Sequence, residues 1–292
     1  CMKEKASKKN RITVILLVAV LLAGLSLMLY PFIADYWNSI HQSQAIAVYM
    51  DDVTKLDDSM YDALWEEAQS YNALLLDDEN RFFPNEEDQR QYDQLLSISD
   101  DGIIGYVEIT SIDVTLPIYH GTSEEILQVA IGHIEGSSLP VGGSSTHCVI
   151  SGHRGLPSSR LFTDIDQLVE GDTFILSVLG ETLTYEVDQI RIVEPDDISL
   201  LAIEKGKDLC TLVTCTPYGV NSHRLLVRGH RVENQKAEGV LRITADAMMI
   251  DSRFVAPALV APILLVMVLL MVLRSLKRKK RKEKGAKEVM VG

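Results

Sequence analysis

The apolar and polar positions of this chain change period several times, and each change predicts a different structural element. Two long apolar runs, at 12–33 and 254–273, carry no charged residue. Twenty helical residues at about 1.5 Å each match a hydrocarbon core of about 30 Å, and a helix satisfies its own backbone in lipid. We therefore expect both runs to span a membrane, the first of them as an uncleaved signal anchor.

Each apolar run has one alternative interpretation. The first run follows a basic segment and also fits a cleaved signal peptide, although it is longer than the usual apolar region and no Ala-x-Ala site follows it. The second run also fits a buried core helix, which its length disfavours.

Between the two runs, the pattern begins with a helical period. Over 44–75, apolar residues recur every three or four positions, which predicts an amphipathic helix or helical pair close to the membrane. Residues 76–93 are acidic and polar, apart from Phe82, Phe83 and the proline that follows them. We expect an exposed loop there, pinned by its aromatic residues.

After residue 102 the apolar residues alternate, as they do in half-buried strands. Strands are expected at 104–110, 115–119, 147–151, 173–178, 182–193, 209–215 and 224–229. Helical insertions are expected at 123–131, where Ser123 suits an N-cap position, and at 160–168. Many short strands with irregularly spaced turn signals predict a mainly β domain, as a closed barrel or a sandwich.

Charge is segregated along the chain and indicates its orientation. Five basic residues lie in 1–11 and nine in 274–292, against three acidic residues in both tails together. Of 28 basic and 41 acidic residues in total, 14 and 38 therefore fall in 35–253, a net charge of −24. Because basic flanks stay in the cytoplasm, we expect both termini inside the plasma membrane and 35–253 outside. A segment this acidic repels phosphate backbones, which argues against nucleic-acid binding.

These observations divide the chain into seven expected segments. They are a cytoplasmic basic segment (1–11), a membrane anchor (12–33), an extracellular helical or lid-like region (34–99), a β domain (100–235), a linker (236–253), a second membrane helix (254–273) and a cytoplasmic basic tail (274–292). The charge of the tail fits both orientation of the chain and attraction to anionic lipids of the inner leaflet.

Cys215 is the cysteine best placed for chemistry. It ends a predicted strand beside the turn 216–219, and the strand that resumes after the turn brings Arg224 back level with it. Alternation places Cys210 on the opposite face, and we expect Cys210 and Cys148 in the core. Position alone leaves two roles open for Cys215, a reactive thiol and a small buried apolar residue.

His153 and Arg224 are the candidate partners of that thiol. A thiolate nucleophile needs a proton donor for the leaving group, and histidine is the usual one. His153 lies just past an apolar strand between two glycines, which leave the imidazole open; an ordinary turn residue is the alternative. Arg224 stays protonated and suits donation to a developing oxyanion, or else a surface charge or salt bridge. The pair His147-Cys148 lacks the companions of a zinc site.

Several blocks of the sequence resemble sortases, most of all the pilus-assembling class C members. TLVTCTPYGVNSHRLLVRG at 211–229 is similar to the active-site block of that family, and SGHRGLPS at 151–158 with LFTD at 161–164 is similar to its histidine block. LPIYHGT at 116–122 and GHIEGSSLPVGG at 132–143 are also similar. The resemblance covers about 100–232 and is specific, because several long blocks occur in the family's order.

The resemblance implies an eight-stranded β-barrel with an N-terminal helical region, flanked by two transmembrane helices. It also implies that Cys215 is the nucleophile, His153 the general acid/base and Arg224 the oxyanion stabiliser, with no cofactor and no metal. The implied partners are pilins and other surface proteins with an LPXTG-like sorting signal. The signal is cleaved between Thr and Gly through a thioacyl enzyme and joined to a pilin lysine amine. Attachment to peptidoglycan, hydrolysis and an inactive binding or scaffold module are the alternatives.

The sequence departs from the class C pattern at the lid that usually covers the active cysteine. No Asp-Pro-aromatic tripeptide occurs in 44–100. Phe82 and Phe83, beside acidic residues and a proline, are the candidate substitute. An open site and a plain linker are the alternatives.

Overall fold

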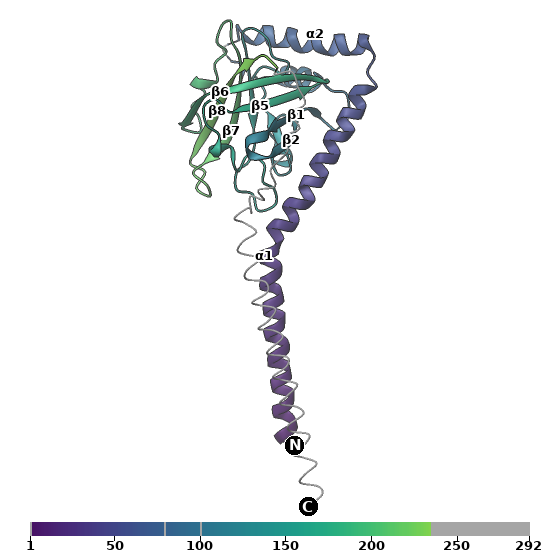
Figure 1. Ribbon diagram of the computed structural model, residues 1–292, viewed down its shortest axis with the longest axis vertical. Helices are drawn as coiled ribbons and strands as arrows, with labels where there is room; N and C mark the ends of the chain where they lie inside the picture. The colour runs from purple at the N-terminus through teal and green to yellow at the C-terminus, as the bar shows by residue number, and fades with distance from the viewer. Residues whose placement is uncertain (1, 79, 100, 235–292) are drawn as a thin grey trace, which may run out of the picture. The chain divides into compact units, whose positions relative to one another are not determined.

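The computed structural model describes residues 2–78, 80–99 and 101–234. Its central feature is a closed barrel of eight strands (Figure 1). The strands are β1 (Ile103–Ile109), β2 (Val114–His120), β3 (Ile131–His133), β4 (Thr146–Ser151), β5 (Thr173–Val178), β6 (Glu181–Val193), β7 (Asp208–Thr216) and β8 (His223–Val232). Around the barrel they follow the order β1-β2-β3-β4-β7-β8-β6-β5, and β5 pairs with β1 to close it. The pairs β2–β3 and β4–β7 are parallel, and the others are antiparallel. The mainly β prediction and its barrel form are confirmed.

All seven predicted strands are present, and the structure adds β3, which the sequence did not predict. The helix predicted at 123–131 is much shorter, since α4 covers only Glu124–Leu127. Its predicted cap is confirmed, because the Ser123 hydroxyl accepts a hydrogen bond from the backbone N–H of Ile126 at 3.4 Å. The chain then leaves the helix at once to pair with β2, so the apolar residues 129–131 belong partly to a strand.

The helix predicted at 160–168 is wrong. Only a short 3-10 helix, η2 (Ile165–Gln167), forms in this segment. Leu161 has a φ of +38°, which lies outside the right-handed helical region, so a helix cannot run through it. The backbone N–H of Phe162 donates to the carbonyl of His153 at 3.1 Å, which ties this segment to the histidine loop.

The loop predicted over 76–93 is also partly wrong, because α3 (Glu86–Tyr92) lies within it. Asn85 and Asp88 form a capping box, each side chain accepting a hydrogen bond from the backbone N–H of the other. Tyr92 is fully buried at the end of this helix. Tyr92 thus anchors the helix in the core, although the acidic residues around it made the segment look like an exposed loop.

The predicted helical pair over 44–75 is confirmed as the end of α1 (Met2–Thr54) followed by α2 (Asp58–Leu75). Among the described residues, α1 is the one helix long and apolar enough to cross a membrane, by length and composition. It contains the predicted span 12–33 and runs on through Pro31 without a break. The predicted second span at 254–273, with the linker before it and the basic tail after it, lies outside the described residues.

Three buried polar side chains attach the helices to the barrel. The hydroxyl of Tyr49 in α1 bonds to the backbone of β1 and of the turn after β5, at 3.1 and 2.9 Å. The amide of Asn72 in α2 exchanges two hydrogen bonds with the backbone of Leu139, at 3.1 and 2.7 Å. The hydroxyl of Tyr92 in α3 accepts a hydrogen bond from Gly121 at 2.9 Å. Each contact is directional, so it fixes where the helix lies as well as burying it.

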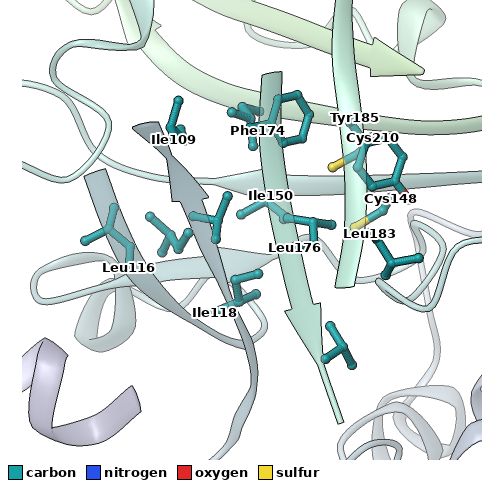
Figure 2. Close-up of a cluster of buried hydrophobic side chains, with 14 of the residues drawn as sticks. Ile109, Leu116, Ile118, Cys148, Ile150, Phe174, Leu176, Leu183, Tyr185 and Cys210 are labelled. Atoms are coloured by element: carbon teal, nitrogen blue, oxygen red, sulfur yellow. The ribbon is translucent and has the colours of Figure 1, made fainter. Parts of the chain in front are cut away.

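The barrel has an apolar interior and a separate apolar cluster on its outer surface. Residues that face the interior include Ile109, Leu116, Ile118, Cys148, Ile150, Phe174, Leu176, Leu183, Tyr185 and Cys210 (Figure 2). The outer cluster consists of Val149, Leu201, Val213 and Leu226, with Phe82, Ile134, Val193 and Leu200 packed against it. Since side chains alternate along a strand, β4 and β7 contribute to both clusters. The candidate site lies at the end of these two strands.

Candidate active site

Cys215 is the accessible cysteine of the three that the structure describes. It lies one residue before the end of β7 and is half-buried, whereas Cys148 and Cys210 are buried. Those two are register partners across β4 and β7 in the barrel interior, as predicted for core residues (Figure 2). Burial raises the pKa of the Cys210 thiol well above its ordinary value, which keeps it protonated and unreactive. Cys215 shares the other strand face with Val213 of the outer cluster.

Arg224 lies directly opposite Cys215 in the antiparallel β7–β8 ladder. The predicted hairpin register is therefore confirmed. Directly opposite residues leave the sheet on the same face, with Cβ atoms about 4.5–5.5 Å apart. Nη1 of Arg224 donates to the backbone carbonyls of Asn221 and His223, at 3.4 and 3.2 Å. These contacts hold the guanidinium beside the turn that follows the cysteine.

The charge of Arg224 is not neutralised by a carboxylate in the part of the chain that the structure describes. Arg228, four residues further along β8, makes a useful contrast. Its guanidinium bonds to both carboxylate oxygens of Asp188 at 3.0 Å and to Glu204 at 2.9 Å. These two arginines on one strand face thus differ in their partners, since Arg228 belongs to an ion-pair network and Arg224 contacts backbone carbonyls.

His153 reaches the same end of the barrel through the parallel β4–β7 pair. Ser151 is the register partner of Val213, and His153 and Cys215 each lie two residues further along. The alignment continues past the ladder, because the backbone N–H of Gly152 donates to the carbonyl of Val213 at 3.0 Å. His153 therefore lies just past the end of β4, close to the end of β7 that carries Cys215. The structure places the three residues that the sequence singled out at the same end of neighbouring segments of the barrel.

Two glycines shape the loop that carries the histidine. A Cβ atom on Gly152 would lie 2.7 Å from the ring of Phe162 and as close to a side chain of β3. Gly155 has a φ of +76° and lies under the ring of Tyr218, with 3.0 Å between the ring and the position of an added Cβ. The loop is packed this closely between two neighbours because its glycines lack side chains.

The candidate lid residues lie beside the outer cluster. Phe82 packs against the cluster, whereas Phe83 is 80% exposed. Arg81 is buried and donates to the carbonyls of Gly136 at 2.9 Å and Leu201 at 2.7 Å. Its guanidinium also lies over the ring of Phe82, 4.3 Å from the ring centre. Arg81 thus pins Phe82 between two loops, on the barrel face that Val213 shares with the cysteine.

Three further histidines are buried or half-buried, and their neighbours are groups of the fold and not of the candidate site. His147 bonds to the carbonyl of Ala202 at 2.9 Å and to the Thr211 hydroxyl at 2.7 Å. Burial lowers the pKa of His147 and of His120 to about 4, so both are neutral at pH 7. His133 is also buried, against the hydroxyl of a tyrosine in α3. In the described ranges, no group of three or more His, Cys, Asp or Glu side chains is arranged to hold a metal ion.

One residue beside the site was missed in the sequence. Arg154 contacts Thr216, the neighbour of Cys215, with 3.3 Å between Nη1 and the hydroxyl oxygen. It also forms an ion pair with Asp166. The available signal was its place directly after the candidate histidine, but a contact across 62 residues is not readable from spacing.

Comparison with known proteins gives the family. Residues 107–232 match a family model described as a sortase domain. Sortase D of Bacillus subtilis is 32% identical over 131 residues, which are 44% of this chain and 63% of that protein. Sortase A of Staphylococcus aureus is 32% identical over 120 residues, which are 40% of this chain and 56% of that protein. The chain thus spans less than two thirds of the length of these curated relatives.

Solved structures match over a larger share of their length. Sortase C1 from Streptococcus agalactiae is 54% identical with a TM-score of 0.64, over 66% of this chain and 100% of that one. Sortase C of Streptococcus pneumoniae is 45% identical with a TM-score of 0.58, over 65% and 97% of the two chains. With a relative this similar matched over its full length, and with the barrel and strand-end cysteine already in place, the chain belongs to the sortase family, and class C sortases are among its structural neighbours.

Proposed function

We propose that the protein is a membrane-anchored cysteine transpeptidase that joins an LPXTG-like sorting signal to a pilin lysine amine. One observation carries the proposal. Arg224 lies opposite Cys215, His153 follows the end of the neighbouring strand β4, and the Arg224 guanidinium forms no ion pair with a described carboxylate. Similarity to class C sortases supports pilins as the substrate class.

In the first half of the proposed reaction, the Cys215 thiolate attacks the carbonyl carbon of the signal's threonine. The carbonyl oxygen becomes an oxyanion, to which the Arg224 guanidinium donates hydrogen bonds. His153, as imidazolium, protonates the glycine nitrogen while the C–N bond breaks. The products are a thioacyl enzyme and the released glycine-led fragment.

In the second half, the acceptor lysine enters as a free amine, after its ε-ammonium has lost a proton to solvent, and His153 is neutral. The amine nitrogen attacks the thioacyl carbon and passes its surplus proton to His153, while Arg224 again stabilises the oxyanion. The C–S bond breaks, which forms the isopeptide bond and returns the Cys215 thiolate. Attack by water in place of the amine gives hydrolysis, so exclusion of water at this step sets the yield of transfer.

The proposed topology is two-pass, with both termini in the cytoplasm and 35–253 outside. The apolar helix α1 and the basic tails support it. An outside location suits an enzyme whose substrates are surface proteins. In the proposed division of the chain, 100–235 is the catalytic domain and 34–99 the helical, lid-bearing region.

Phe82 is the better candidate for the proposed lid. It packs on the outer cluster and is held there by Arg81, whereas Phe83 is largely exposed and therefore poorly suited to cover a thiol. A substrate peptide that follows the β7 face would have to displace Phe82. Lid opening then becomes a step that precedes acylation.

The proposal is tested by intact-mass spectrometry of the full-length protein in detergent, mixed with an LPXTG-type peptide. Wild type should gain the mass of the peptide cleaved after threonine, and Cys215→Ala should not. Cys210→Ala is the matched control, because it removes a thiol from the same strand but from the opposite, buried face. Adduct formation by Cys215→Ala would refute the proposed nucleophile.

Three acceptors then separate the alternatives. A purified pilin with an available lysine, a peptidoglycan-type amine and water are offered to the thioacyl enzyme in parallel. Preferred transfer to the pilin supports pilus assembly, and preferred transfer to the peptidoglycan amine supports anchoring. Absence of any adduct with the lid residue Phe82 replaced by alanine would favour an inactive binding module.

A further inference from the structure

Arg154 connects three segments around the proposed site. It follows His153 in the chain, and its side chain is only 10% exposed. Nη1 donates to the hydroxyl of Thr216, directly after Cys215, at 3.3 Å, and Nη2 forms an ion pair with Asp166 of η2. The loop of the histidine, the end of the cysteine strand and the 3-10 helix therefore meet at one guanidinium.

The contact completes a bracket around the two proposed catalytic residues. Before them, the hydroxyl of Thr214 donates to the carbonyl of Gly152 at 2.7 Å. After them, Arg154 donates to the hydroxyl of Thr216 at 3.3 Å. The residues on both sides of His153 are thus bonded to the residues on both sides of Cys215. These two contacts fix the position of the histidine loop relative to the end of β7, along the direction of the strand.

Strand alternation separates this bracket from the reacting groups. Thr214 and Thr216 lie on one face of β7, and Cys215 between them lies on the other. Arg154 therefore contacts β7 through a side chain on the face opposite the thiol. This geometry favours a role through position over a direct contact with the reacting groups.

Packing alone does not account for an arginine here. Among the described residues, the Nε–H of Arg154 is one of three buried side-chain polar atoms without a hydrogen-bond partner. An unpaired buried donor lowers stability, so an apolar side chain would fill the same space at smaller cost. What an apolar side chain lacks is a pair of donors spaced to reach Asp166 and Thr216 together.

We propose that Arg154 is a positioning residue, which keeps His153 aligned with Cys215 along the strand direction by bridging Asp166 and Thr216. The proposal rests on the proposed function, because it assigns a purpose only if those two residues react. A displacement of about 1 Å at a reacting group lowers rates by about 100-fold. Loss of the bridge should therefore lower kcat and leave KM nearly unchanged, since Arg154 does not touch the substrate.

The test compares Arg154→Met with Arg154→Lys and Thr216→Val in the full-length protein, with active sites counted by alkylation of Cys215. Arg154→Met should lower kcat for thioacyl formation by about 10–100-fold, with KM within about 2-fold. Lysine keeps one donor and should restore part of the rate. Arg191→Met is the matched control, because Arg191 is exposed and its side chain makes one hydrogen bond within the described residues, to the carbonyl of its neighbour Ile190, at 2.8 Å.

Two further readouts distinguish positioning from stability. The limb of the pH–rate profile that reports His153 should weaken in Arg154→Met, because a displaced imidazole no longer controls proton transfer. Adding Thr216→Val to Arg154→Met should cost little more, because both changes break one contact. An unchanged kcat per active site, a loss shared by Arg191→Met, or full additivity would overturn the proposal.

Two further variants distinguish a failure of the positioning role from a failure of the proposed function. His153→Ala and Cys215→Ala are run in the same assay. If these variants keep the activity, the proposed function fails. If they lose it while Arg154→Met and Thr216→Val both keep wild-type kcat, only the positioning role fails. Thr216→Val changes a single buried hydroxyl to a methyl group, so it serves even if Arg154→Met does not fold.

Discussion

Replacing Arg224 and Arg228 by methionine, one at a time, should separate the chemistry of the site from the stability of the barrel. Both residues belong to β8 and leave it on the same face. Among the described residues, Arg224 bonds to two backbone carbonyls beside a turn, and Arg228 bonds to the carboxylates of Asp188 and Glu204. The same substitution thus removes an unneutralised donor in one case and an ion-pair network in the other.

The contacts set the expected magnitudes. Loss of one oxyanion donor lowers kcat by about 100–1000-fold, which is the effect expected for Arg224→Met. Its two surface contacts are worth about 0.5 kcal/mol or less, so Tm should change by about 2 °C at most. Arg228 is 14% exposed, and losing its charged hydrogen bonds should cost about 1–3 kcal/mol. That corresponds to a fall in Tm of roughly 2–12 °C.

The assay measures thioacyl formation at saturating peptide and Tm on the same preparations. Arg224→Met should be folded and nearly inactive, and Arg228→Met less stable but active at low temperature. Arg224→Lys should recover a small part of the rate, because an ammonium is a donor without the planar fork of a guanidinium. A large fall in Tm for Arg224→Met with near-normal kcat would refute the assignment of its donors to the oxyanion.

Three further outcomes are expected. Phe82→Ala should raise the rate of Cys215 alkylation because it removes the packed lid aromatic, whereas Phe83→Ala should not; equal rates in all three proteins would count against a lid. Burial lowers the pKa of His147 from 6.5 to about 4, so the unfolded chain takes up a proton over this range that the folded chain does not. Stability should be fully present above pH 6.5 and fall toward pH 4, and His147→Gln should flatten the fall in urea midpoints measured between pH 7 and 5. Gly152→Ala should move the histidine loop and lower kcat strongly at unchanged alkylation of Cys215, because the added Cβ would lie 2.7 Å from neighbouring side chains.

The strands were predictable because their signal is local. Alternation along 209–215 and 224–229 placed Cys215 and Arg224 on one hairpin, and the hairpin length alone brought them level. The sequence could likewise indicate which face of the strand held Cys210. The relative position of two residues joined by a short turn can be predicted without knowing the rest of the barrel.

The missed elements depend on contacts that the sequence does not display. β3 is only three residues long and exists because it pairs with β2. The segment 160–168 is not a continuous helix because Leu161 takes a positive φ of +38° where the chain packs against the histidine loop. The short helix 86–92 is the exception, because its capping box is a local signal in the sequence and was overlooked in a segment whose acidic composition favoured a loop. Arg154 was missed for the same reason as β3, since its partner is 62 residues away.

The two kinds of strand pairing at the site differ in how the chain reaches them during folding. Cys215 and Arg224 are joined by a hairpin with a six-residue connection, so their contact closes only a short loop. His153 comes near them through the parallel β4–β7 pair, whose two strands are separated in the sequence by β5 and β6. Contacts of large sequence separation form late because loop closure precedes them. A chain in which only the β7–β8 hairpin has formed would hold Cys215 beside Arg224 without His153, so recovery of activity during refolding would report formation of the β4–β7 pair.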